Sequence, residues 1–276
     1  MKQFISKTIL AVLMVGLILT SVEIYKLHDG SYVVKVLGNE VYRSITKSKK
    51  HKKVKVLVIG DSVANQLYSN TSYNDSIYSL ACNQAISLAG DYFLIHNFFE
   101  ANEDQLPEKV ALILCPGSFS YDLDLFAFQY FLKPFYTDEY KPLMNHYLTE
   151  RIEDIPFYYT TQWPFVKTTS LAPEYEPESP FDAEWLSPIS VSYLNKIDSL
   201  CATHHVKLEL LAAPSRASKQ PEIEQLVKNQ KTSLNNDSLL INYVSTLRYL
   251  DDSLFCDPVH FIRKYIPTDY YQLVEK

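Results

Sequence analysis

Residues 55–62 read Lys-Val-Leu-Val-Ile-Gly-Asp-Ser, and this stretch decides the fold. A short apolar run ends abruptly in Gly-Asp-Ser, and a helical pattern follows over residues 63–68. This order predicts a buried strand, a tight turn and the N-terminus of a helix. Ser62 would then lie where backbone N–H groups and the positive end of the helix dipole converge, so it is a candidate nucleophile. A simple helix cap is the alternative role for Ser62.

A second motif lies near the C-terminus, where Asp257 and His260 are three positions apart. A serine hydroxyl is a weak nucleophile until an imidazole accepts its proton, and a carboxylate orients that imidazole best. With Gly-Asp-Ser and Asp-x-x-His in this order, the sequence resembles the SGNH, or GDSL-type, hydrolases. The resemblance covers residues 54–276. It implies Ser62 as the nucleophile, His260 as the base and Asp257 as the partner of the base.

Acyl transfer through a serine also needs N–H donors for the negative charge of the tetrahedral intermediate. The Ser62 amide is a natural first donor of this oxyanion hole, and Gly90 matches by position the glycine that the family places after the second strand. The family's third donor is an asparagine after the third strand, but residues 116–119 read Pro-Gly-Ser-Phe. Ser118 could donate through its hydroxyl, or Gly117 and Ser118 through their amides. The missing asparagine keeps a non-catalytic role open.

From residue 54 onward, apolar runs alternate with helical patterns, which predicts βαβ units. We expect a three-layer α/β/α domain with a mostly parallel, flavodoxin-like sheet. Further strands are expected at 78–82, 110–115, 206–212 and 239–244, and helices at 91–101, 190–205 and 222–234. Because ligands bind beyond the carboxyl ends of parallel strands, Ser62, Gly90, Ser118, Arg216 and His260 are expected around one pocket. Arg216 is a candidate substrate-binding residue, and a surface salt bridge is its alternative role.

The segment 119–188 is crowded with aromatic residues and prolines. We interpret it as an insertion or cap over the strand ends. Its aromatic side chains could bind sugar rings or an acyl chain, although clustered aromatics more often belong to a core.

The N-terminus has the layout of a secretory signal or a signal-anchor over residues 1–25. Lys2 and Lys7 precede the apolar run 9–20, and Glu23 follows it. Because no small-x-small cleavage site is present, we expect an uncleaved membrane anchor, with secretion after signal cleavage as the alternative. The lysines should remain cytoplasmic, which places the domain on the extracytoplasmic side, periplasmic or extracellular.

Residues 26–53 are expected to form a stem or linker, with a short strand at 32–37. The basic run 47–53 within it is interpreted as a solvated linker. The formal net charge of −6 gives no basis for binding nucleic acid. Four cysteines show no Cys-x-x-Cys spacing, so buried free thiols and no metal site are expected. Nucleotide-binding glycine motifs are absent from the sequence, so no cofactor is expected.

The leading hypothesis is a serine esterase or deacetylase that acts on O-acyl groups, with an acylated small molecule or a polysaccharide as its substrate. The sequence also resembles membrane-anchored enzymes of the alginate O-acetyltransferase type. Transfer of acetyl groups to a cell-surface polysaccharide is therefore one alternative. A non-catalytic protein that binds a glycan or a partner is the other.

Overall fold

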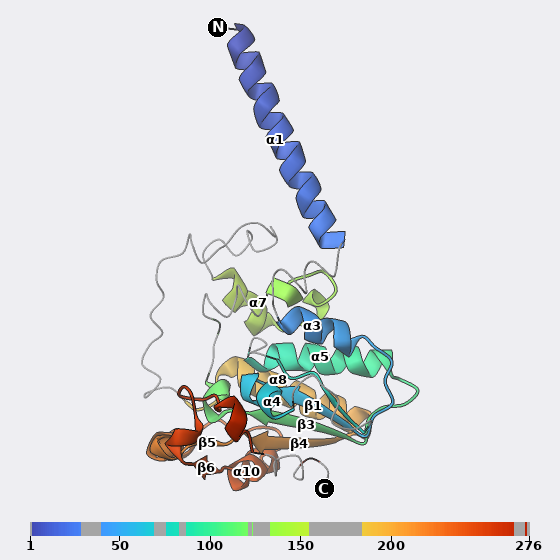
Figure 1. Ribbon diagram of the computed structural model, residues 1–276. Helices are drawn as coiled ribbons and strands as arrows, with labels where there is room; N and C mark the ends of the chain where they lie inside the picture. Colours follow the sequence, from blue (N-terminus) through green and yellow to red (C-terminus); the bar gives the residue numbers. More distant parts are fainter. Residues whose placement is uncertain are drawn as a thin grey trace.

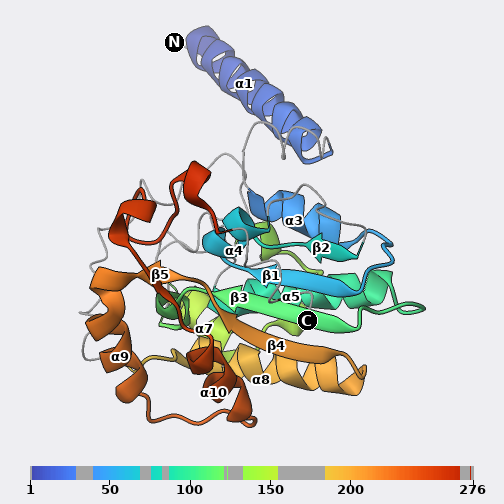
Figure 2. The same ribbon diagram turned by 60° about the horizontal axis from the view of Figure 1, so that its bottom comes forward.

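The computed structural model describes residues 2–28, 40–68, 76–82, 87–120, 123, 133–154, 184–267 and 274. The chain has a mixed α/β fold with a parallel central sheet (Figure 1). Its strands are β1 (Val56–Gly60), β2 (Ile77–Ser79), β3 (Lys109–Leu114) and β4 (Lys207–Ala212). They lie side by side in the order β2-β1-β3-β4 (Figure 2). Gly60 is paired in register with Ile113, which aligns the carboxyl ends of β1 and β3.

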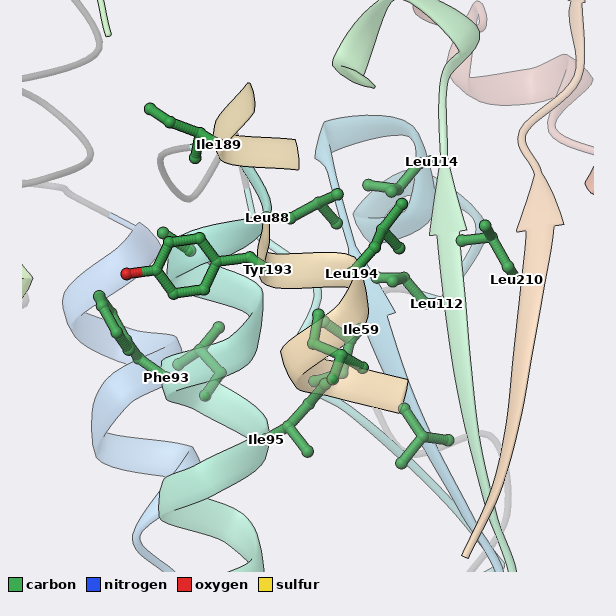
Figure 3. Close-up of a cluster of buried hydrophobic side chains, with 14 of the residues drawn as sticks. Ile59, Leu88, Phe93, Ile95, Leu112, Leu114, Ile189, Tyr193, Leu194 and Leu210 are labelled. Carbon is green, nitrogen blue, oxygen red and sulfur yellow. The ribbon is translucent and has the colours of Figure 1, made fainter. Parts of the chain in front are cut away.

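Both faces of the sheet are covered, which explains why β1 and residues 110–114 of β3 are continuous apolar runs. On one face, Ile59 and Leu112 pack with helices α5 (Ser87–Ala101) and α8 (Pro188–Thr203) (Figure 3). On the other face, Val58 and Ile113 pack with helix α4 (Ser62–Leu67) and with side chains of the C-terminal segment. This arrangement is compatible with a three-layer α/β/α fold.

Gly60 ends β1 in a backbone conformation that only glycine tolerates. Its φ is +144°, and a Cβ built on it would lie 1.9 Å from the carbonyl oxygen of Ile113. Without a side chain, β1 can approach β3 closely and still turn directly into Asp61 and α4. The glycine of the Gly-Asp-Ser motif therefore fixes where the following two residues lie.

Strand predictions at 78–82, 110–115 and 206–212 agree with β2, β3 and β4 to within three residues at either end. The strand predicted at 239–244 is wrong, because these residues belong to helix α10 (Ser238–Ser245). Leu239 and Tyr243, one helical turn apart, are its buried side chains, and a short apolar run cannot distinguish this pattern from a strand.

The remaining helices differ from prediction mainly at their ends. The helix predicted at 222–234 is α9 (Gln220–Lys228), preceded by the 3-10 turn η7 (Ala217–Lys219). A small parallel pair, β5 (Ser215–Arg216) and β6 (Tyr249–Leu250), was not predicted and joins the segment before α9 to the C-terminal segment.

Helix α3 (Glu40–Ser48) belongs to the folded domain, although the sequence analysis placed it in the linker. Its Val41, Ser44 and Ser48 are buried, and it packs against α5. Lys47, at the start of the basic run, is also largely enclosed: its Nζ donates to the carbonyl of Ser79, and burial lowers its pKa to about 8. The strand predicted at 32–37 lies outside the described residues.

At the N-terminus, helix α1 (Lys2–His28) is 27 residues long and stands apart from the sheet (Figure 1). Its segment Gln3–Val22 is long and apolar enough to cross a membrane, and none of it is buried within the protein. It fits either a signal peptide or a membrane anchor.

Most of the aromatic insertion 119–188 lies outside the described residues. The described part includes η3 (Lys133–Phe135), η4 (Lys141–Leu143) and α7 (His146–Glu153). Phe135 and Tyr140 are buried there and pack their rings on Phe93 of α5. These two aromatic residues therefore belong to the core.

Candidate active site

The turn after β1 assigns different roles to its two polar residues. Asp61 caps α4, because its Oδ1 accepts from the N–H groups of Val63 at 2.9 Å and Ala64 at 3.3 Å. Ser62 is the first residue of α4, and its hydroxyl is not the cap. The capping role considered for Ser62 thus belongs to its neighbour, and the Ser62 hydroxyl is left for another partner.

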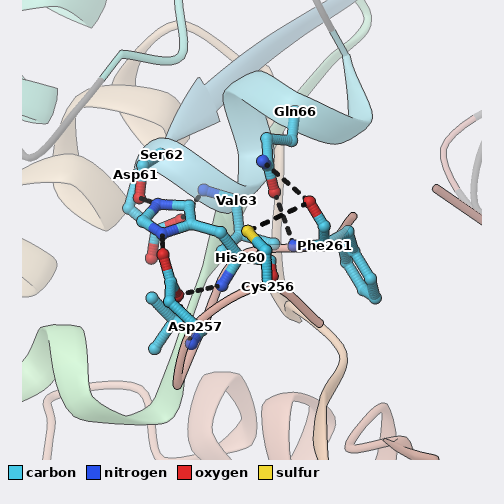
Figure 4. A network of polar contacts seen from close by, with 9 residues as sticks. Asp61, Ser62, Val63, Gln66, Cys256, Asp257, His260 and Phe261 are labelled. Carbon is cyan, nitrogen blue, oxygen red and sulfur yellow. Dashed lines mark hydrogen bonds and ion pairs between the residues drawn. The ribbon is translucent and has the colours of Figure 1, made fainter. Parts of the chain in front are cut away.

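That partner is His260, at the other end of the domain. Its Nε2 lies 2.7 Å from Ser62 Oγ, and its Nδ1 lies 2.8 Å from Asp257 Oδ2 (Figure 4). With the ring proton on Nδ1, His260 donates a hydrogen bond to Asp257, and its Nε2 accepts one from the Ser62 hydroxyl. The His260 side chain is 30% exposed and that of Asp257 is 43% exposed, so solvent reaches the group. The structure brings together the three residues that the sequence analysis chose.

The loop that carries His260 is held by local bonds and by α4. Asp257 Oδ1 accepts from the N–H groups of Val259 at 2.9 Å and His260 at 2.8 Å, which closes a tight turn. Gln66 of α4 accepts from the Phe261 N–H at 3.0 Å (Figure 4). Gln66 was not among the predicted site residues, although its position four residues after Ser62 places it on the same face of the helix.

The same contacts keep Asp257 ionised. Partial burial by itself raises the pKa of this carboxyl, but the N–H groups of His260 and Val259 and the His260 ring outweigh it, so the pKa lies below its ordinary value. A carboxylate beside the imidazole favours the tautomer that can accept from Ser62, and it stabilises the imidazolium that forms when the proton moves.

The second carboxylate oxygen of Asp61 reaches the end of the neighbouring strand. Oδ2 accepts from the Cys115 N–H at 2.6 Å and from the Ser118 hydroxyl at 2.7 Å. Asp61, which is 4% exposed, therefore ties the turn before Ser62 to the 3-10 turn η1 (Pro116–Phe119). This role of Asp61 was not predicted from the sequence, although Asp61 lies inside the Gly-Asp-Ser motif.

These contacts change the expectation for Ser118. Its hydroxyl donates to Asp61, and its N–H donates to the Cys115 carbonyl at 2.9 Å. Both groups that were candidates for the oxyanion hole already have acceptors within the protein. Ser118 is therefore better placed to hold η1 than to bind an oxyanion.

Gly90 is the fourth residue of α5, whereas the predicted helix began at residue 91. It is buried. It is not among the residues that line the pocket beside Ser62. The expectation that the helix begins only after Gly90 is thus wrong. Its role as an oxyanion donor stays a prediction, because residues 83–86 before α5 lie outside the described residues.

A pocket of about 250 Å³ opens beside Ser62. Its lining includes Ser62, residues of η1, and Ile223 and Leu226 of α9. Arg216 also lines it and donates to Asp252 at 2.9 Å. Because Lys219 is likewise paired, with Glu222, both basic side chains of the wall are matched by a carboxylate. A role for Arg216 in substrate binding stays a prediction.

No protein-family model matches the chain, and no curated protein matches its sequence.

The geometry alone therefore indicates the chemistry. A hydroxyl at a helix N-terminus, within 2.7 Å of an imidazole that a carboxylate orients, is the arrangement required for a nucleophilic serine. Among the described residues no group of three or more His, Cys, Asp or Glu side chains could hold a metal ion.

The four cysteines are free thiols, as expected. Cys82 and Cys201 are buried, and burial raises their pKa. Cys256 is instead exposed, beside the loop that carries His260, which differs from the expectation of buried thiols.

Proposed function

We propose that this protein is a serine esterase or deacetylase of the SGNH type that removes O-acyl groups, with an acylated carbohydrate as its substrate. The observation that carries the proposal is the 2.7 Å contact between Ser62 and His260, two residues 198 positions apart in the chain. A contact over such a separation depends on the whole fold, and local sequence preference does not explain it.

In the first step, Ser62 Oγ attacks the acyl carbon while its proton passes to His260 Nε2. The tetrahedral intermediate collapses, and the sugar oxygen leaves with the proton from His260. In the second step, a water gives a proton to His260 and attacks the acyl-serine, which releases the carboxylic acid and restores the Ser62 hydroxyl. Asp257 keeps its negative charge throughout and stabilises the imidazolium.

The pocket supports a short, uncharged acyl group. Its volume of about 250 Å³ is below the range of roughly 300–1,000 Å³ for drug-sized ligands. Ile223, Leu226 and Val259 give it apolar walls, and its basic side chains are paired with carboxylates. An acetyl group fits this chemistry better than a long chain or an anionic group.

The N-terminal helix supports an extracytoplasmic site of action. Segment Gln3–Val22 can cross a membrane, and Lys2 and Lys7 favour a cytoplasmic N-terminus. An anchored domain on the outer side of the membrane would meet acylated surface or extracellular glycans, which is why we propose a carbohydrate substrate.

The test uses the full chain in detergent micelles with p-nitrophenyl acetate and acetylated xylan as substrates. We expect acetate release that Ser62→Ala abolishes and that Ser199→Ala, a serine exposed on α8, leaves unchanged. Acetyl transfer to an added glycan without acetate release would identify an O-acetyltransferase instead. Equal rates for the wild type and Ser62→Ala, or no reaction with either substrate, would contradict an enzymatic role and favour a glycan-binding protein.

A further inference from the structure

The tetrahedral intermediate needs more than one N–H donor at its oxygen, and removing one such donor typically costs a factor of about 10²–10³ in kcat. Ser62 supplies the first. As residue N1 of α4, it has no acceptor for its N–H inside the helix. A further donor is therefore needed, and its assignment rests on the proposed function.

The end of β3 lies beside Ser62, because Asp61 binds it directly. Four consecutive residues there line the pocket, 115–118. The Cys115 N–H donates to Asp61, Pro116 has no N–H, and the Ser118 N–H donates to the Cys115 carbonyl. Gly117 is the residue of the four whose N–H has no acceptor among the described residues.

Gly117 is also open toward the pocket. It is exposed, and a Cβ added to it would have no heavy atom of the described residues within 4 Å. By contrast, a Cβ at Gly60 would collide with the backbone. Nothing in the packing therefore requires glycine at position 117, and open space beside the peptide leaves room for a substrate atom to approach.

The turn that carries Gly117 is held firmly. Asp61 binds the residue before η1 and a residue inside it, and the Trp185 indole donates to the Pro116 carbonyl at 2.9 Å. Phe119, at the end of η1, is fully buried. A donor on such a turn is preorganised, so it loses little free energy to reorganisation when the charge develops.

We propose that the Gly117 N–H is an oxyanion donor, acting with the Ser62 N–H. It takes the place of the asparagine side chain expected at this strand end. In this arrangement Ser118 and Asp61 are positioning residues, because they hold η1 and touch no reacting atom.

Two substitutions of Gly117 distinguish the effect of losing its N–H from the effect of adding a side chain. Gly117→Pro removes the N–H, although it also disfavours the helical backbone of Pro116 before it, while Gly117→Ala keeps the N–H and adds a methyl group that meets none of the described residues. We expect kcat for p-nitrophenyl acetate to fall about 10²–10³-fold in Gly117→Pro, with KM changed little, and to fall at least about 10-fold less in Gly117→Ala, which keeps the donor. Thermal unfolding of the full chain should match the wild type for Gly117→Ala and occur at a lower temperature for Gly117→Pro, so kcat of the proline variant is measured well below its Tm.

A folded Gly117→Pro variant with wild-type kcat would overturn this inference and leave the proposed function intact. An equal loss of kcat in Gly117→Ala would also overturn it, since that variant retains the donor. If Gly117→Pro does not fold, replacing Gly117 by glycolic acid, which exchanges the N–H for an ester oxygen, decides the matter: a loss of kcat of about 10-fold or more supports the N–H donor, and a wild-type kcat opposes it. A wild-type chain that does not hydrolyse the ester would refute the proposed function, and this inference with it.

Discussion

Replacing Asp61 with asparagine tests how the site is built. The carboxylate accepts four hydrogen bonds, two at each oxygen: from the N–H groups of Val63 and Ala64, and from the Cys115 N–H and the Ser118 hydroxyl. An asparagine has one carbonyl oxygen and one NH₂ group. If the carbonyl keeps capping α4, the NH₂ group faces the Cys115 N–H, and two donors oppose each other.

The cost follows from these contacts. Losing a hydrogen bond to a charged group is worth about 1.5–3 kcal/mol, and a buried N–H left without an acceptor costs about 1–3 kcal/mol more. The Ser118 hydroxyl can rotate to accept from the NH₂ group and recover about 1 kcal/mol. We therefore expect Asp61→Asn to lower the free energy of unfolding by about 3 kcal/mol, which corresponds to a fall of about 6–12 °C in Tm.

The assay is thermal unfolding of the full chain in detergent micelles, followed by circular dichroism. The matched control is Asp104→Asn, the same chemical change at a side chain that is 74% exposed, and it should leave Tm within about 2 °C of the wild type. A decrease of less than about 2 °C in Asp61→Asn would refute the view that this carboxylate joins the two strand ends.

Three further predictions follow from single contacts. Gly60→Ala should cost more than about 4 kcal/mol and yield little folded protein, because its Cβ would lie 1.9 Å from the Ile113 carbonyl oxygen; normal yield and Tm would contradict this. Leu226→Ala should enlarge the pocket and raise the ratio of kcat/KM for butyrate over acetate esters about 4-fold for each methylene that finds room. The control is Val227→Ala on the same helix, and an unchanged ratio would place the acyl group elsewhere. Because contacts in the fold lower the pKa of Asp257, its carboxylate stabilises the protein fully above pH about 4, and this contribution is lost as the pH falls through the folded pKa. In urea titrations, the difference in the free energy of unfolding between the wild type and Asp257→Asn should therefore shrink between about pH 6 and about pH 3. A difference that stays constant would contradict a stabilising role for the ionised carboxylate.

The sequence predicted the parts of this fold that depend on local pattern. The apolar run before Gly-Asp-Ser could only be a short buried element, and the strand, turn and helix that follow from it are present as β1, Asp61 and α4. The triad was predictable because its members stand in two recognisable motifs. Their contact required only that both motifs lie at the carboxyl edge of one sheet.

Tertiary context decided the features that the sequence did not reveal. The apolar run of α10 fits a buried strand as well as a helix, and the burial of Leu239 and Tyr243 settles it. Two of the hydrogen bonds of Asp61 come from residues 54 and 57 positions away, at the end of β3, so no local spacing in the sequence predicts them. Likewise α3 reads as part of a polar linker, and only its packing on α5 shows that it belongs to the domain.

The central claim is that Ser62 is a nucleophile activated by His260. The most direct measurement is to treat the full chain with a fluorophosphonate probe and to locate the adduct by peptide mass spectrometry. The account predicts an adduct on Ser62 that is absent in Ser62→Ala and forms at least about 10²-fold more slowly in His260→Gln. An unmodified Ser62, or equally fast labelling in His260→Gln, would contradict it.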